Sequence, residues 1–154
     1  MKFPKVKEKK TAANEPRRQY AALPWRIQGG PEILLLTSRD TRRWVIPKGW
    51  PMKGRKPHMT AALEALQEAG LLGKIAKAKF GSFHYDKRLN SGEAVVCSVD
   101  VFPLRVLRQR KKWPEKDQRI TQWFPPAEAS GLVDEPELSE MIRSFEETLA
   151  TRQA

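Results

Sequence analysis

Residues 44–72, WVIPKGWPMKGRKPHMTAALEALQEAGLL, constrain the fold and function of this chain more than any other stretch. The pattern predicts a short strand over residues 44–47, a basic loop containing glycine, and a helix over about residues 57–70. Pro57 suits the first helical turn, and Gly70 suits the end, where a left-handed backbone conformation costs glycine least. The stretch therefore predicts a strand, a loop and a helix in direct succession.

The predicted helix carries two carboxylates one turn apart. Glu64 and Glu68 share one row of the helix and repel one another by about 0.2–0.5 kcal/mol unless a cation lies between them. A narrow apolar stripe on another side is predicted to consist of Ala62, Ala65, Leu66 and Ala69. Because Mg²⁺ prefers oxygen ligands, a divalent ion would relieve the repulsion between the two carboxylates.

These residues resemble the Nudix box, the loop and helix that characterise the Nudix hydrolase family. The box positions that this chain keeps are Gly49, Glu64, Ala65, Glu68, Gly70 and Leu71. The strand before the loop, RRWVIPKGW, and the later segment QWFPPAEA resemble the diphosphoinositol-polyphosphate and dinucleoside-polyphosphate branch of the family. The resemblance covers residues 20–149 and implies an α/β fold, an α/β/α sandwich with a mixed central sheet.

The resemblance also implies a chemistry. It is the metal-dependent hydrolysis of phosphoanhydride bonds, a pyrophosphatase activity, in a highly anionic substrate such as a diphosphoinositol polyphosphate or a dinucleoside polyphosphate. Glu64 and Glu68 would be the catalytic residues. They would bind Mg²⁺ or Mn²⁺ together with the backbone carbonyl of Gly49 and the amide oxygen of Gln67. Such an ion offsets the charge of a pyrophosphate and orients it for attack by water.

Three positions depart from the box. Arg55 stands where the family has its first Glu, Leu63 where it has Arg, and Gln67 where it has the first residue of the Glu-Glu pair. These changes predict weaker metal binding and leave three outcomes open: slow hydrolysis, a carboxylate supplied from elsewhere, or a non-catalytic module that binds a polyphosphate ligand. The downstream candidates for a further carboxylate are Glu93, Asp100 and Glu115.

The chain is strongly basic, with a formal net charge of +11 and a pI near 10.0. A positive field of this size attracts polyanions without selecting one. The basic residues expected to bind substrate are Lys48, Lys53, Arg55, Lys56, Arg43 and Arg26. A second basic cluster at residues 105–112 is predicted to be a solvated loop, with a phosphate clamp as the alternative. An RNA or DNA partner is the weaker alternative, because no recognition motif accompanies the charge.

At 154 residues with 40% hydrophobic content, the chain is the size of one domain. Residues 1–18 are predicted to be a flexible basic arm, and residues 19–152 a single domain. The longest apolar run, residues 33–36, is too short to span a bilayer, and the basic start lacks the apolar segment of a secretory signal. A cytoplasmic protein without a membrane partner is therefore expected, and its oligomeric state stays open.

The remaining segments predict the rest of the sheet and a terminal helix. Residues 20–28 are predicted to be an edge or bulged strand, because Pro24 cannot donate a hydrogen bond to a neighbour. Residues 74–87 and 93–107 predict two long strands joined by a hairpin turn, with Cys97 as a buried strand residue. Asp134 and Glu137 predict a capping arrangement for the last helix. Its core stripe would be Leu138, Met141, Ile142, Phe145 and Leu149.

Overall fold

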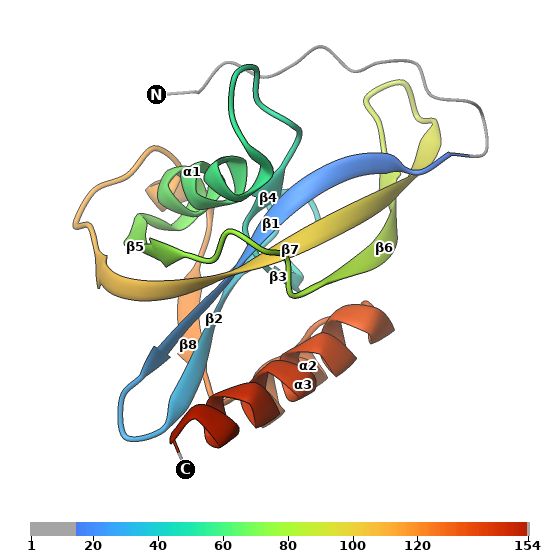
Figure 1. The fold of residues 1–154 in the computed structure, drawn as a ribbon. Coiled ribbons are helices and arrows are strands. Elements are labelled where there is room, and N and C mark those ends of the chain that lie inside the picture. The colour runs from blue at the N-terminus through green and yellow to red at the C-terminus, as the bar shows by residue number, and fades with distance from the viewer. Residues whose placement is uncertain (1–14, 154) are drawn as a thin grey trace.

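A mixed eight-stranded sheet lies between helices in the computed structural model, which describes residues 15–153 (Figure 1). The strands are β1 (Arg17–Ile27), β2 (Pro31–Thr37), β3 (Trp44–Val45), β4 (Lys48–Gly49), β5 (Leu71–Ile75), β6 (Gly81–Arg88), β7 (Ala94–Gln109) and β8 (Thr121–Phe124). The helices are α1 (Pro57–Ala69), α2 (Pro126–Leu132) and α3 (Pro136–Gln153), with a short 3-10 turn η1 (Lys116–Gln118). The predicted α/β/α sandwich with a mixed sheet is confirmed.

The two longest strands, β1 and β7, form the centre of the sheet. They run parallel, with a register that extends from Arg17 opposite Cys97 to Trp25 opposite Arg105. On its other side β7 pairs first with β6 and then with β5, while β1 pairs with β4 and β2. Strand β2 in turn pairs with β3 and β8. These other pairs are antiparallel, which is why the sheet is mixed.

Each face of the sheet has its own core, with α1 on one face and α2 and α3 on the other (Figure 1). The five stripe residues predicted for the last helix are all buried against the sheet, and Cys97 is buried in β7, as predicted. On α1 the predicted stripe is shifted: Ala61, Ala65 and Ala69 are buried, whereas Ala62 and Leu66 are half-buried. The shift arises because α1 also buries its acidic side. The helix face that packs on the sheet therefore includes Ala61 in place of Ala62.

Pro24 lies in the interior of the sheet, so the prediction of an edge strand is wrong. The N–H of Ala22 points away from β7 and donates to the carbonyl of Pro47. Because strand residues alternate in direction, the nitrogen of Pro24 faces the same side. Neither neighbour pairs there, since β4 pairs at Tyr20 and Ala21, and β2 pairs only from Trp25 onward. The missing donor of proline therefore breaks no ladder bond.

Residues 74–87 form two strands instead of the single strand predicted. Strand β5 ends at Ile75 and β6 begins at Gly81. Between them the chain leaves β7 and returns to it, held by bonds from Ala76 N to Pro103 O and from Phe80 N to Val101 O, both 2.8 Å. The break lies opposite Pro103, which has no N–H to continue an antiparallel ladder.

Two further predictions about chain ends are corrected. Arg17 and Arg18 belong to β1 instead of the predicted arm, whose residues 1–14 lie outside the described part of the chain. Helix α3 begins at Pro136, so Asp134 lies outside the cap, and Glu137 accepts hydrogen bonds from the backbone N–H of His84 at 2.9 Å. Within residues 15–153, no helix is long and apolar enough to cross a membrane.

A buried carboxylate on β7 ties three strands of the sheet together. Asp100 accepts hydrogen bonds from Arg18 Nη1 at 2.6 Å and Ser82 Oγ at 2.7 Å, and Lys79 Nζ lies 3.5 Å away. Burial opposes ionisation, but the two hydrogen bonds and the adjacent cations hold the pKa of Asp100 below its usual value.

We expect Asp100→Asn to lower the free energy of unfolding by about 1–2 kcal/mol at neutral pH, because Asn cannot accept two charge-assisted bonds. Since the folded pKa is depressed, this contribution is present above the unfolded pKa of about 3.9 and is lost as the pH falls through the folded pKa. Urea denaturation of wild type and variant at decreasing pH should show the two curves converging in acid. Asp86→Asn, at an exposed position on β6, is the control.

Candidate functional site

A pocket of about 440 Å³ opens beside the acidic side of α1. Helix α1, strand β4, strand β6, the loop between β2 and β3, and the segment between β7 and β8 all contribute to its walls. Its charged lining consists of Arg39, Asp40, Lys48, Glu64, Glu68, Lys87, Glu115 and Arg119. Cations and carboxylates from segments far apart in the sequence therefore meet in one place.

Glu64 lines the pocket and is only 1% exposed, and its carboxylate packs against Gly49. A Cβ added at Gly49 would overlap the Glu64 carboxylate. The glycine is held in place because β4 pairs with β1, where Gly49 lies opposite Tyr20. A glycine at this position therefore provides space for an acidic side chain, which brings two of the predicted metal-binding residues together.

Glu68 is 5% exposed and is the second carboxylate of α1 in the pocket. Burial raises the pKa of Glu68 to about 8, opposed by Arg119 and Lys48 and reinforced by Glu64 and Glu115. Burial also lowers the pKa of Lys48 to about 8, opposed chiefly by Glu68. The carboxylates of Glu64, Glu68 and Glu115 lie close enough together to favour the binding of a further cation.

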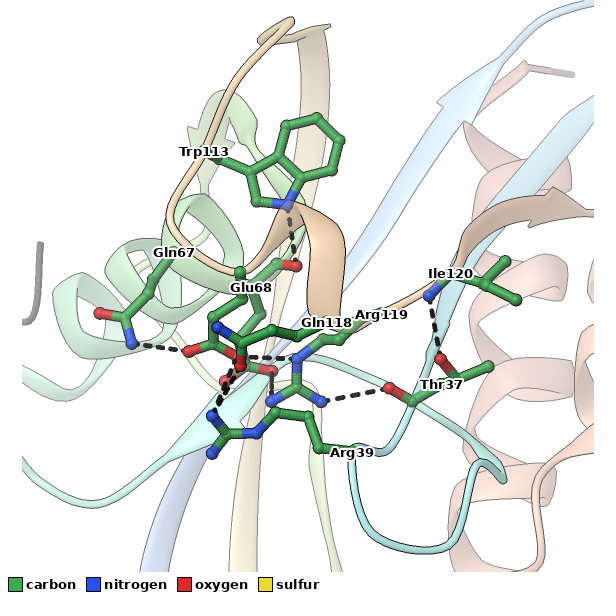
Figure 2. Close-up of polar contacts among 9 residues, drawn as sticks. Thr37, Arg39, Gln67, Glu68, Trp113, Gln118, Arg119 and Ile120 are labelled. Carbon is green, nitrogen blue, oxygen red and sulfur yellow. Dashed lines mark hydrogen bonds and ion pairs between the residues drawn. The ribbon is translucent and has the colours of Figure 1, made fainter.

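The third carboxylate is Glu115, which is 6% exposed and comes from the segment between β7 and β8. Gln67 and Arg119, both labelled in Figure 2, bind its two oxygens: Gln67 Nε2 donates to Oε2 and Arg119 Nε donates to Oε1, both at 2.8 Å. Burial would raise the pKa of Glu115, but these hydrogen bonds and the charge of Arg119 hold it below its usual value. Of the downstream candidates the structure brings in Glu115, because Glu93 is exposed in a hairpin and Asp100 is held by Arg18.

Arg119 is the functional residue that sequence reasoning missed. Its side chain is 10% exposed, Nη2 lies 3.7 Å from Glu68 Oε1, and Nη1 donates to the carbonyl of Thr37 at 3.2 Å. The four-residue spacing of Glu115 and Arg119 is the only local signal, and it is common in solvated segments. Their burial depends on contacts with Thr37 and Glu68, which are distant in sequence.

The segment that carries Glu115 is attached to the C-terminal end of α1. Trp113 Nε1 donates to the carbonyl of Glu68 at 3.1 Å, and Glu115 N donates to the carbonyl of Gln67 at 3.1 Å (Figure 2). These carbonyls belong to the last turn of a helix, where intrahelical partners are lacking. Gly70 ends α1 with a φ of 69°, and a Cβ there would overlap the indole of Trp113.

The basic cluster before this attachment is solvated as predicted, but only its end is a loop, because β7 extends to Gln109 and includes Arg105 and Arg108. Arg105, Arg108, Arg110, Lys111 and Lys112 are exposed. They do not line the pocket, so the alternative of a phosphate clamp receives no support from their position. The solvated part of the segment ends at Trp113, which is half-buried against α1.

Of the basic residues predicted to bind substrate, Lys48 lies in the pocket wall. Lys53, Arg55 and Lys56 precede α1 and are exposed, outside the pocket lining. Two cations that the sequence did not single out, Arg39 and Lys87, line the pocket instead. Their places depend on the β2–β3 loop and on the register of β6, neither of which a local motif reveals.

The other two predicted residues are engaged with carboxylates outside the pocket. Arg43 donates to Glu135 at 2.6 Å and to Asp134 at 3.4 Å. Arg26 donates to Glu32 at 2.7 Å and its guanidinium lies 4.1 Å from the centre of the Trp123 ring. Both therefore support the connections between elements.

The oxygen donors of α1 fit a divalent ion of the magnesium type. Glu64 and Glu68 offer carboxylates, and the buried Oε1 of Gln67 has no hydrogen-bond partner among the described residues. In residues 15–153 no group of three or more His, Cys, Asp or Glu side chains has the arrangement of a complete metal site. The set therefore fits an ion held by one or two carboxylates and completed by phosphate and water, the usual mode for Mg²⁺.

Comparison of sequences finds relatives with one common name. The chain is 25% identical to Nudix hydrolase 21, chloroplastic, of Arabidopsis thaliana over 134 residues, which cover 84% of this chain and 66% of the relative. It is 27% identical to Nudix hydrolase 13, mitochondrial, of the same plant over 131 residues, which cover 79% of this chain and 65% of the relative. This chain is similar in sequence to proteins named Nudix hydrolases. The matches span about two thirds of the length of these curated relatives, and no family model matches the chain.

Solved structures show the same fold. The C. elegans Ap4A hydrolase, in a binary complex, superimposes with a TM-score of 0.66 at 20% identity, covering 88% of this chain and 98% of that chain. The E. coli dihydroneopterin triphosphate pyrophosphohydrolase also gives a TM-score of 0.66, at 14% identity, covering 87% of this chain and 99% of that chain. The Nudix fold predicted from the box is confirmed, and the names of the relatives agree with the predicted hydrolase class.

We expect Gly49→Ala to lower the free energy of unfolding by about 1–3 kcal/mol, because the added methyl group must displace a buried carboxylate. Gly131→Ala in α2 is the matched control, since a Cβ there meets nothing within 4 Å. That substitution should leave stability unchanged or raise it by up to about 1 kcal/mol. Urea denaturation of both variants measures the difference, and equal midpoints would contradict the close packing of Glu64 on Gly49.

Proposed function

We propose that this protein is a metal-dependent hydrolase that cleaves a phosphoanhydride bond in a small, highly anionic substrate. The observation that supports this most directly is the burial of Glu64 and Glu68 beside Gly49, in a pocket whose wall also carries Arg39, Lys48 and Lys87. Such a pocket offers carboxylates to a metal ion and cations to phosphate groups. The names of the relatives support the same class of reaction.

In this proposal the acidic residues of the pocket bind the metal ion and the basic residues bind phosphate. Glu64 and Glu68 would hold Mg²⁺ or Mn²⁺ together with the oxygen of Gln67 and the carbonyl of Gly49. When bound, the metal ion supplies charge neutralisation of the phosphates and activation of water. Lys48 lines the same pocket, so it would bind a phosphate oxygen of the substrate. Water then adds to one phosphorus while the bridging oxygen leaves with the other, giving two phosphate products.

The substrate that we propose is a dinucleoside polyphosphate or a diphosphoinositol polyphosphate, each of which carries several phosphate groups. The net charge of +11 and the pocket cations Arg39, Lys48 and Lys87 suit such a ligand. A solved structure with the same fold is named an Ap4A hydrolase. A cytoplasmic location stays a prediction from the sequence, and nucleic acid is a weaker alternative partner that only the overall charge favours.

We expect purified protein to release phosphate products from at least one substrate in a panel of dinucleoside polyphosphates, diphosphoinositol polyphosphates and nucleoside triphosphates, with Mg²⁺ or Mn²⁺. Glu64→Gln and Glu68→Gln should each lower kcat at least about 100-fold, because each removes a charged metal ligand. Glu128→Gln, at an exposed position on α2, should behave like wild type.

Binding of one of these ligands without turnover would contradict the hydrolase and favour the non-catalytic module. Isothermal titration calorimetry with the same panel separates the two functions. Binding to single-stranded RNA that survives both glutamate substitutions would favour the third function, a nucleic-acid binder, and it should weaken steeply with salt.

We expect Lys48→Met to raise KM for a polyphosphate substrate about tenfold or more with a smaller change in kcat, because it removes a phosphate contact and keeps much of the side-chain volume. The end of the Lys48 side chain lies over the Tyr85 ring, with Nζ 5.0 Å from its centre, and the methionine side chain can also pack on an aromatic ring. Lys77→Met, at an exposed position between β5 and β6, is the control. An unchanged KM in the Lys48 variant would remove this residue from the substrate site.

A further inference from the structure

The polar cluster in Figure 2 holds a cationic side chain, Arg119, among oxygen acceptors. Arg119 lies between two carboxylates, with Nε 2.8 Å from Glu115 Oε1 and Nη2 3.7 Å from Glu68 Oε1. Its third contact is the carbonyl of Thr37, at 3.2 Å from Nη1. The guanidinium is thus surrounded by oxygen acceptors, which is the environment that a divalent ion also requires.

We propose that Arg119 is a built-in cation of this pocket, which takes the place of a divalent ion between Glu68 and Glu115, and that Gln67 is the matching change that stabilises the arrangement. The proposal rests on the proposed metal-dependent function, because it concerns how many ions the pocket accepts. Arg119 is a positioning residue, since it would affect metal binding only through its contacts with Glu68 and Glu115.

Gln67 fits this arrangement and a glutamate would not. Gln67 Nε2 donates to Glu115 Oε2 at 2.8 Å, inside the protein. A glutamate at this position, where the Nudix box has one, would place a second carboxylate against Glu115 with no proton to share. Such a pair is unfavourable in a buried site unless a cation lies between them. The amide and the guanidinium together therefore satisfy Glu115 without a metal ion.

The protein positions Arg119 rigidly. Its neighbour Ile120 donates its N–H to Thr37 Oγ1 at 2.9 Å, and Thr37 N donates to Ile120 O at 3.0 Å. On the other side Glu115 is fixed by its own backbone bond to Gln67 O and by Trp113, which is attached to α1. The guanidinium therefore lies beside the oxygens that an ion would need, and like charges only a few ångströms apart repel strongly where water is scarce.

The box Arg and the first box Glu are both absent from this chain, where Leu63 and Arg55 stand. Leu63 is half-buried and Arg55 is exposed, so neither supplies a charge to the pocket. Arg119 restores a positive group next to Glu68 from a different part of the chain. The consequence is a pocket that accepts one ion fewer than it would with glutamate at position 67 and no arginine at position 119.

The test counts Mn²⁺ ions by electron paramagnetic resonance titration of the substrate-free protein. We expect the double variant Gln67→Glu/Arg119→Gln to bind one more Mn²⁺ per chain than wild type. Arg119→Lys, which keeps the charge, should bind the same number as wild type. The matched control Arg108→Gln removes an exposed arginine outside the pocket and should also leave the count unchanged.

An equal count in wild type and double variant would overturn the inference, and so would a gain in Arg119→Lys. This readout does not involve turnover, so it separates the inference from the proposed function. Wild type that binds no Mn²⁺, with one ion in the double variant, would support the role of Arg119 and contradict the metal-dependent hydrolase.

A second measurement tests Gln67 if the double variant does not fold. In EDTA, Gln67→Glu alone should melt at least about 2–4 °C below wild type, because a carboxylate then faces Glu115. Excess Mn²⁺ should restore part of this loss. Gln122→Glu, at an exposed position on β8, should melt like wild type. An unchanged melting temperature of Gln67→Glu in EDTA would contradict the matched role of Gln67.

Discussion

The structure depends on the burial of three carboxylates, Glu64, Glu68 and Glu115, in one small region. Each is less than a tenth exposed, and an unpaired buried charge costs several kcal/mol. For Glu115 this cost is offset by hydrogen bonds from Gln67 and Arg119. Glu68 is only partly compensated, which its pKa of about 8 reflects. The site is thus stabilised on one side by the protein and left attractive to a cation on the other.

The rest of the fold serves to hold these groups at fixed positions. The parallel pair of β1 and β7 forms a long central platform, and β4 is added to β1 so that Gly49 lies under Glu64. Small alanines on α1 allow the helix to lie close to the sheet, which brings its acidic side to the pocket. The segment after β7 is then attached to the end of α1 through Trp113. A polar site built on such elements loses little conformational entropy when a ligand binds.

Local sequence predicted the parts of this arrangement that local physics controls. The helix over residues 57–69, its glycine end and the core stripe of α3 follow from periodicity and capping. It failed where the outcome depended on neighbours: Pro24 was tolerated in a central strand because β2 and β4 leave a gap there. The lysines and arginine before α1 looked like phosphate contacts, yet only Lys48 reaches the pocket wall.

The sequence by itself determined the fold class, the acidic side of α1 and the loss of the charges that the box has at positions 55, 63 and 67. Tertiary structure alone decided which groups replace that charge. Arg119 reaches Glu68, and Arg39 reaches Glu115, through contacts that span dozens of residues, and no short spacing encodes such contacts. The physical reason is that periodicity and capping act within a few residues, whereas electrostatic compensation of a buried carboxylate depends only on distance in space.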